Sequence, residues 1–493
     1  MAGSAEEGVT VPAVAVNRLP EELLSLVFSV CKSEDADFLE TCELVCRKWR
    51  TLTDSNCCLW SSIDFRWTPS RITRHLQRSG NAGLVLLLQF HSESGPEHAH
   101  QPAMSLANAV GLAVSERHRW RTLRVSLGCC TEEVFHNFLS LCRSALPYVQ
   151  DLHIHWPALV GSPIPEENIL GDETWFNVLS SDDVILRHVN IPWAIRGANP
   201  QIYSRVRRLS VSISAEECHQ VVDMFNDMQQ LESFSCTALG FDSTWESRVN
   251  GCASLPCLSD LSISFEDPTV TMTLCLGLLV PSLQSFSMCF WHSPQRYHIW
   301  VQLMALFAAL GFRVPSWGDV RLLKVDLLRA QDPENPYEDS VWETPPYQLH
   351  VTLALFKALE TLIITGHPHD VKTLLVPSQF MQEEPSSFSN AEGWPYPKLK
   401  HLAVNFPVED LITIAQARAE SDDVPTLRSV TAYVDDVSES QKTIEELACH
   451  THDVYISRTR SVRTEAECRE SWWQDGLAAN THMFLANPLY SEQ

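Results

Sequence analysis

The chain has 493 residues, of which 45% are hydrophobic, 20% are charged and 9% are aromatic. This composition is typical of globular proteins, and the length is enough for roughly two to four domains. Lysine and arginine total 36 against 61 aspartate and glutamate residues, which gives a formal net charge of −25. Because this charge repels phosphate groups and anionic lipids, we expect neither a nucleic acid nor a membrane surface to be a partner.

The first residues and the cysteines indicate the cellular compartment. Residues 1–16 lack the basic region and apolar core of a secretory signal, and we expect them to form a flexible tail. The longest apolar run, near residues 274–280, is too short to cross a bilayer. The 16 cysteines are scattered along the chain, which favours reduced thiols in the cytoplasm and/or the nucleus.

The sharpest local pattern lies at residues 17–66, which we expect to fold as short amphipathic helices. The tetrapeptide Leu-Pro-Glu-Glu at 19–22 predicts a helix start, because proline suits the first helical position and the glutamates lie at the positive end of the helix dipole. Apolar residues follow at helical spacing, namely Leu23, Leu24, Val27, Phe28 and Cys31. A second stretch repeats this pattern with Leu39, Cys42, Val45, Cys46 and Trp49. Helices this short cannot bury so much apolar surface alone.

Three motifs in this segment occur in the order and spacing of an F-box. They are Leu-Pro-x-Glu at 19–22, Val-Cys-Arg-x-Trp at 45–49 and Leu-Trp at 59–60. The segment 17–66 therefore resembles an F-box domain from end to end. One departure is that Phe38-Leu39 stands where the family commonly has a Leu-Asp pair.

The resemblance implies a non-catalytic adaptor that needs no cofactor. F-box domains dock on Skp1, the adaptor subunit of a cullin-based ubiquitin ligase, and the rest of the chain holds a client protein. Docking of this kind resembles a helix that fills a partner's groove. The matching positions in this chain are Leu19, Pro20, Leu23, Leu24, Val27, Phe28, Val45, Cys46 and Trp49. Some of these residues must instead hold the domain's own core, and we expect Trp60 to be a core residue.

Downstream, a weak repeat runs from residue 67 to residue 436. Five segments share the pattern Pro-x-[Leu/Val]-x-x-apolar-x-apolar, and they begin at Pro147, Pro256, Pro281, Pro397 and Pro425. Similar patterns without proline extend the series, so that strands are expected near residues 120, 149, 186, 206, 231, 258, 283, 322, 359, 399 and 427. Several of these intervals match the period of about 20–29 residues that is typical of leucine-rich repeats.

Stretches that predict helices lie between these strands, at 131–142, 216–228, 300–309 and 408–419. Each strand and helix would form one unit that needs neighbours to bury its apolar face. We therefore expect an α/β fold in which a helical F-box is followed by an open leucine-rich-repeat-like solenoid with a parallel sheet. The alternative is a different α/β or β-rich fold with degenerate periodicity.

The remaining segments set the expected domain boundaries. Residues 67–80 predict a short helix that ends at a glycine, and residues 84–88 predict a buried strand. Together they look like the first repeat after the F-box in many fungal F-box proteins. Residues 437–493 are polar and mixed, and we expect them to cap the last repeat and then fray. The expected domains are thus a tail at 1–16, an F-box at 17–66, a solenoid at 67–436 and a cap and tail at 437–493.

Motifs for catalysis and for metal binding are scarce. The chain contains no Cys-x-x-Cys pair, phosphate-binding loop, nucleophile elbow or His-Glu-x-x-His motif. The three histidines and two carboxylates at 91–100 are better explained as a solvated loop than as a metal site, so we expect no bound metal. Two alternatives stay open: an F-box scaffold that binds Skp1 without directing ubiquitination, and an enzyme with an unrecognised Cys/His or metal centre.

Side chains alternate between the core and the open face along each expected strand. In the strand near residue 149, this places His153 and His155 on the open face. Most other residues on that face are small and polar, such as Ser264. If the client does not bind this face, we expect it on the inserts at 332–346 or 378–395. Because large side chains usually carry the binding energy, the expected client contacts are Arg124, His153, His155 and Tyr433.

Overall fold

The computed structural model divides into two compact units, residues 1–185 and residues 186–493. Both units contain parallel β-strands. The structure describes residues 19–34, 37–89, 111–126, 148–155, 186–191, 203–214, 222, 224–239, 253–265, 274, 277–291, 319–328, 356–365, 375, 394, 396–404, 408–434 and 440–458.

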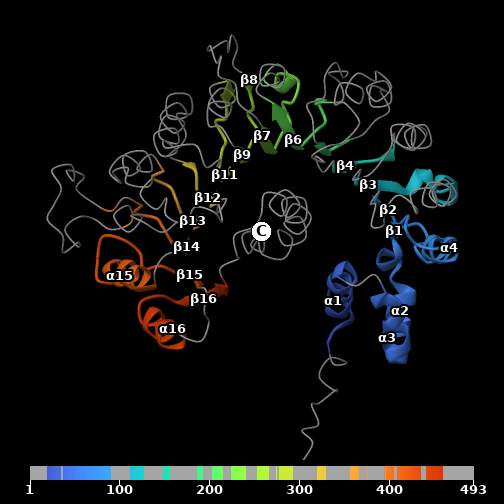
Figure 1. The fold of residues 1–493 in the computed structure, drawn as a ribbon, viewed down its shortest axis with the longest axis horizontal. Helices are drawn as coiled ribbons and strands as arrows, with labels where there is room; N and C mark the ends of the chain where they lie inside the picture. The colour runs from blue at the N-terminus through green and yellow to red at the C-terminus, as the bar shows by residue number, and fades with distance from the viewer. Residues whose placement is uncertain are drawn as a thin grey trace, which may run out of the picture. The chain divides into compact units, whose positions relative to one another are not determined.

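Short helices open the first unit, as the sequence predicts (Figure 1). α1 (Glu21–Glu34) begins directly after Pro20, whose carbonyl accepts a hydrogen bond from the Leu24 N–H at 3.0 Å. The extended backbone of Cys46 separates α2 (Phe38–Val45) from α3 (Arg47–Ser55). The side chain of Asn56 then accepts a hydrogen bond from the Cys58 N–H and starts the 3-10 helix η2 (Cys57–Trp60). The breaks at Cys46 and Asn56 therefore let the helices turn back on a shared core.

A parallel sheet follows these helices within the first unit. Its strands are β1 (Ser62–Asp64), β2 (Leu84–Gln89), β3 (Trp120–Ser126), which follows the 3-10 turn η3 (Arg117–Arg119), and β4 (Asp151–His155). α4 (Pro69–Arg78) connects β1 to β2 and starts at a proline, whose missing N–H costs nothing in the first turn. It ends just before Gly80, whose φ of 51° is readily adopted by glycine. The helix and strand predicted at 67–88 are confirmed.

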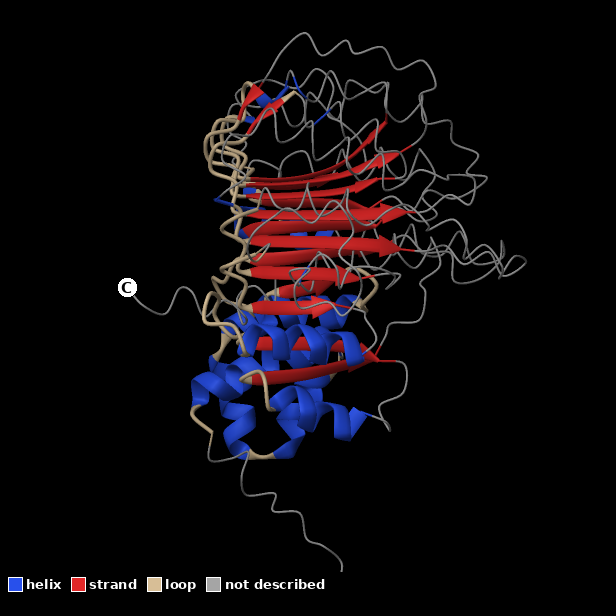
Figure 2. Cartoon of the chain, turned by 90° about the vertical axis from the view of Figure 1, so that its left-hand side faces the viewer, coloured by secondary structure: helices blue, strands red, loops and turns tan. Residues whose placement is uncertain are grey.

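Among the described residues of the second unit, parallel strands run side by side (Figure 2), and they pair in chain order. They are β5 (His188–Ile191), β6 (Arg208–Ser214), β7 (Ser233–Leu239), β9 (Asp260–Phe265), β11 (Ser285–Trp291), β12 (Leu322–Leu328), β13 (Thr361–Thr365), β14 (His401–Val404), β15 (Ser429–Val434) and β16 (Asp453–Arg458). The short strands β8 (Ala253–Ser254) and β10 (Leu278–Leu279) pair with each other. Each predicted strand position contains a strand, so the expected α/β fold with a parallel sheet is confirmed.

The strands of the second unit bury apolar side chains at matching register positions. One such row is at most 2% exposed and consists of Leu209, Phe234, Leu261, Phe286, Leu323, Leu362, Leu402 and Val430. This confirms that side chains alternate between a buried face and the opposite face along each strand. The expectation that Ser264 lies on an open surface is wrong. Ser264 lies on the face predicted to be open and is 0% exposed, because alternation determines only the face of a side chain and not what covers that face.

The sheet continues beyond residue 436, where the sequence predicts a cap. α16 (Ser440–Ala448) leads into β16, which pairs with β15 from Asp453 to Arg458. α15 (Val408–Ala419) confirms the helix predicted at 408–419. The helices predicted at 131–142 and 300–309 lie outside the described residues, as does much of the one predicted at 216–228.

Candidate docking site on the N-terminal helices

One face of α1 forms the core of the helical segment. Leu24 and Phe28 on α1 are fully buried, and Phe28 makes T-shaped ring contacts with Phe38 at 5.7 Å and with Trp49 at 4.9 Å. The other buried members of this core are Leu39, Cys42, Leu52, Leu59 and Trp60. These short helices therefore have an apolar core of their own.

A second apolar face of α1 remains uncovered. Leu23, Leu26 and Val27 are 48%, 44% and 42% exposed. At about 100° per helical residue, these three side chains share one side of α1, which differs from the side that carries Leu24 and Phe28. Water therefore contacts aliphatic surface that a helix within a finished core would bury.

The junction of α2 and α3 adds further exposed aliphatic surface. Leu44 and Val45, the last residues of α2, are 80% and 56% exposed. The Lys48 Nζ donates a hydrogen bond to the Leu19 carbonyl at 3.2 Å, which holds the start of α3 against the start of α1. We refer to the residues Leu23, Leu26, Val27, Leu44 and Val45 as the aliphatic patch.

The structure divides the nine predicted docking residues into two groups. Pro20, Leu23, Val27 and Val45 are exposed. The other five lie within the helical core or pack at its edge: Leu19, Leu24, Phe28, Cys46 and Trp49. Sequence reasoning missed Leu26 and Leu44, although Leu26 is one turn after Leu23 on the same side of the helix.

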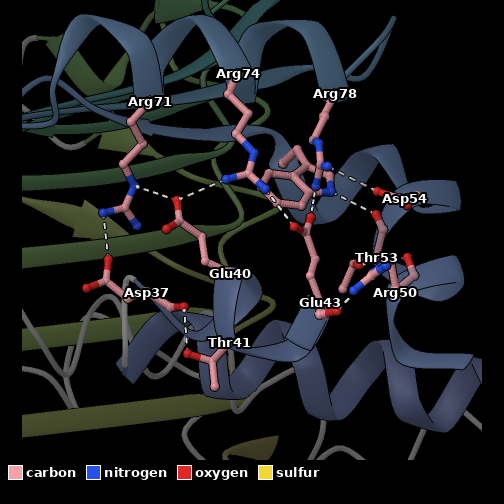
Figure 3. A network of polar contacts seen from close by, with 11 residues as sticks. Asp37, Glu40, Thr41, Glu43, Arg50, Thr53, Asp54, Arg71, Arg74 and Arg78 are labelled. Carbon is pink, nitrogen blue, oxygen red and sulfur yellow. Dashed lines mark hydrogen bonds and ion pairs between the residues drawn. The ribbon is translucent and has the colours of Figure 1, made fainter. Parts of the chain in front are cut away.

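A polar network connects these helices to α4 (Figure 3). Arg71 contacts Asp37 at 2.6 Å, and Arg74 contacts Glu43 at 2.6 Å. Arg78 also pairs with Glu43, whose side chain is only 12% exposed, and lies 3.4 Å from Asp54. The network links α2 and α3 to the first strand–helix unit.

Buried aromatic rings reinforce the same connection. Trp60 is fully buried, which confirms its predicted core role, and its Nε1 donates a hydrogen bond to the Thr53 carbonyl at 2.7 Å. Its ring contacts the ring of His75 on α4 at 4.9 Å, and His75 also contacts Trp67 at 4.4 Å. Burial, together with the nearby charge of Lys32, lowers the pKa of His75 to about 4. His75 is therefore neutral at physiological pH.

The predicted client contacts are only partly visible on the strands. Arg124 on β3 and His153 on β4 are half-buried neighbours in the sheet register. Burial lowers the pKa of Arg124, although Asp151 opposes this change. The side chains of His155 and Tyr433 lie outside the described residues. In the second unit, Tyr455 is 57% exposed on β16 and was missed because no strand was predicted there.

Candidate metal sites and membrane spans are absent from the part of the chain that the structure describes. Within the described ranges, no three His, Cys, Asp or Glu side chains gather in a way that could hold a metal ion. The histidine-rich segment 91–100 lies outside those ranges. In the same part of the chain, the helices are too short or too polar to span a bilayer.

Comparisons with known proteins identify the helical segment. Residues 16–66 match the family model described as F-box-like. No curated protein matches the chain. Among solved structures, the chain is similar to a Rad7 and Elc1 complex in yeast, with 13% identity, 91% of each chain covered and a TM-score of 0.34. It is also similar to a TLR13–ssRNA13 complex, with 12% identity, 81% and 62% covered and a TM-score of 0.26. At these TM-scores neither similarity establishes a shared fold.

Proposed function

We propose that this protein uses the F-box-like domain at 16–66 as the docking module of a substrate-recognition adaptor in an Skp1–cullin–F-box ubiquitin ligase. The observation that carries the proposal is the aliphatic patch, which stays exposed although the domain has its own complete core. Apolar surface of this kind, in a segment that matches the F-box-like family, favours a partner that buries it. The protein itself would be a non-catalytic subunit without a cofactor, working in the cytoplasm and/or the nucleus.

The proposed Skp1 contacts are the exposed members of the predicted set, extended by the two residues that the structure adds. They are Pro20, Leu23, Leu26, Val27, Leu44 and Val45. The remaining predicted residues, Leu19, Leu24, Phe28, Cys46 and Trp49, would hold these contacts in position. A cullin would then be reached through Skp1 rather than by direct contact.

The proposed client site is the polar face of the leucine-rich-repeat-like strands. Arg124 and His153 support it in the first unit, because they lie side by side and combine charge with large side chains. His155 and Tyr433 remain proposed contacts, and exposed Tyr455 extends the set within the second unit. Stacked repeats offer such surfaces to partner proteins.

Copurification with Skp1 tests the docking proposal. We expect Leu23→Asp and Val45→Asp to reduce Skp1 capture at least tenfold, because each substitution would force a charge into an apolar interface. Leu112→Asp is the matched control, since Leu112 is 36% exposed outside the F-box-like domain and should not affect capture. Normal capture by both patch variants would refute the proposal.

A second measurement separates this proposal from the Skp1-binding scaffold. The intact chain with Skp1 should recover a cullin, and the reconstituted complex should transfer ubiquitin to a bound client. Skp1 capture without cullin recovery and without ubiquitin transfer would favour the scaffold.

A further inference from the structure

Lysine is scarce in this chain and unevenly placed. The sequence contains eight lysines against 28 arginines, although lysine is normally one of the commonest residues. The eight are Lys32, Lys48, Lys324, Lys357, Lys372, Lys398, Lys400 and Lys442. Residues 49–323 therefore form a stretch of 275 residues without a lysine, which we call the lysine gap.

The lysine gap does not reflect a lack of basic side chains. It contains 19 arginines, and several of them form ion pairs, as Arg71 and Arg74 do with acidic residues on and before α2. Beyond the gap lysine returns, since residues 324–493 contain six lysines and seven arginines. A uniform bias of the whole chain against lysine would not produce this contrast, so the gap is a property of one region.

The side-chain amines of the two lysines that precede the gap both donate hydrogen bonds to backbone carbonyls. The Lys32 Nζ donates a hydrogen bond to the Leu59 carbonyl at 2.5 Å, and the Lys48 Nζ donates one to the Leu19 carbonyl at 3.2 Å. Both side chains are half-buried among the helices of the F-box-like domain. An amine in such a position cannot easily reach a carbonyl group of another molecule.

The described lysines beyond the gap include two accessible ones. Lys357 and Lys398 are exposed and lie in the turns that precede β13 and β14. In contrast, the Lys400 Nζ pairs with Glu360 at 2.7 Å, and Lys324 is half-buried on β12. The side chains of the remaining two, Lys372 and Lys442, lie outside the described residues.

Resting on the proposed function, we infer that this distribution protects the adaptor from the ubiquitin ligase that it serves and directs self-modification to the lysines beyond the gap, among which Lys357 and Lys398 are the exposed ones that the structure describes. An adaptor is held beside a ubiquitin thioester, which raises the effective concentration of the reacting groups to about the millimolar range. Arginine does not react there, because its guanidinium stays protonated and delocalised. Arginine in place of lysine therefore keeps the positive charge and removes the acceptor.

The chemistry of the modification explains why a reachable amine is required. A neutral lysine Nζ attacks the thioester carbonyl at the ubiquitin C-terminus, and the isopeptide C–N bond forms. The C–S bond breaks, the cysteine of the conjugating enzyme leaves as a thiolate, and the amine gives its extra proton to water. At residues 1–323 the lysine amines are either hydrogen-bonded or absent, which prevents the first of these events at a lysine.

A reconstituted ligase with ubiquitin, activating enzyme, conjugating enzyme and ATP tests the inference on the full chain. Peptide mapping should find ubiquitin remnants on Lys357 or Lys398 and none on Lys32 or Lys48. The charge-preserving double variant Lys357→Arg/Lys398→Arg should reduce self-modification at least threefold. Conversely, Arg117→Lys and Arg205→Lys each place a new exposed amine within the lysine gap, and at least one should become modified.

Several results would overturn the inference. They are remnants on Lys32 or Lys48, unchanged self-modification in the double variant, or no modification of either added lysine. If the intact chain fails to capture Skp1, the proposed function fails instead, and the premise of the inference fails with it.

An amine-acylating reagent measures lysine accessibility without any ligase. N-hydroxysuccinimidyl acetate should modify Lys357 and Lys398 at least tenfold faster than Lys48. The comparison uses Lys48 because burial lowers the pKa of Lys32 to about 8, which raises the neutral, reactive fraction of that amine. Equal rates for Lys357, Lys398 and Lys48 would refute the claim that Lys48 is protected, whatever the outcome with Skp1.

Discussion

The F-box-like helices and the strands of the second unit use their apolar residues differently. On α1, one apolar side packs into a core around Phe28, whereas the other side leaves Leu26 44% exposed. On the strands, apolar residues such as Leu362 are buried in a row across neighbouring repeats, and the opposite face carries mainly small and polar residues. A repeat can be completed by the next repeat of the same chain, whereas the short helical domain has apolar surface left for another chain.

Truncation of apolar side chains offers the strongest test of this difference. Phe28→Ala and Leu362→Ala should each cost about 2–5 kcal/mol, because both leave a cavity in a packed core. Leu26→Ala should cost less than about 0.5 kcal/mol, because its side chain already contacts water. Hydrogen exchange, followed on peptides from each region, would report these changes separately. A large local destabilisation by Leu26→Ala would contradict the division of α1 into a core side and a free side.

The buried His75 lies where the helical domain meets the first strands and should make that junction sensitive to acid. Its folded pKa of about 4 is below the ordinary value of 6.5, so the unfolded chain binds the proton more readily. The contribution of neutral His75 to stability is complete above pH 6.5 and falls by about 3 kcal/mol as the pH drops to about 4.

Denaturant unfolding at pH 7 and at pH 4.5 checks this prediction. His75→Phe should lose less stability between these two pH values than the unchanged protein does. His118→Gln is the control, since His118 is exposed on η3, and it should leave the pH dependence unaltered. Identical pH dependence in His75→Phe and the unchanged protein would show that this histidine does not control the junction.

The polar network between α2 and α4 should give the smallest effects, and they should follow burial. Glu43 is 12% exposed and pairs with two arginines, so Glu43→Gln should cost about 1–2 kcal/mol. Asp37 is 70% exposed and pairs with Arg71, so Asp37→Asn should cost less than about 0.5 kcal/mol. The free energy of unfolding of each variant, measured at low and high salt, would distinguish the two ion pairs, since only the Asp37 pair should be strongly screened. Equal costs would indicate that burial does not control this network.

Local patterns in the sequence were sufficient to predict the strand positions and the F-box-like segment. Apolar alternation along a strand is a property of a few consecutive residues, and it placed a strand at each expected position from residue 120 to residue 427. The motifs at 19–22, 45–49 and 59–60 likewise depend only on spacing, and the match at 16–66 covers them. The same reasoning missed β16, because its sequence Asp-Val-Tyr-Ile-Ser-Arg mixes apolar, polar and charged residues.

Only the tertiary structure decided which apolar residues of α1 belong to the core and which remain exposed. Both sides of this helix are apolar, so periodicity alone could not separate Phe28 from Leu23. The pairing of Arg74 with Glu43 was also beyond local reasoning, because the partners are 31 residues apart and meet only when α4 packs beside α2. Sequence thus determined the elements and their apolar faces, whereas packing between distant segments determined which faces remain available to a partner.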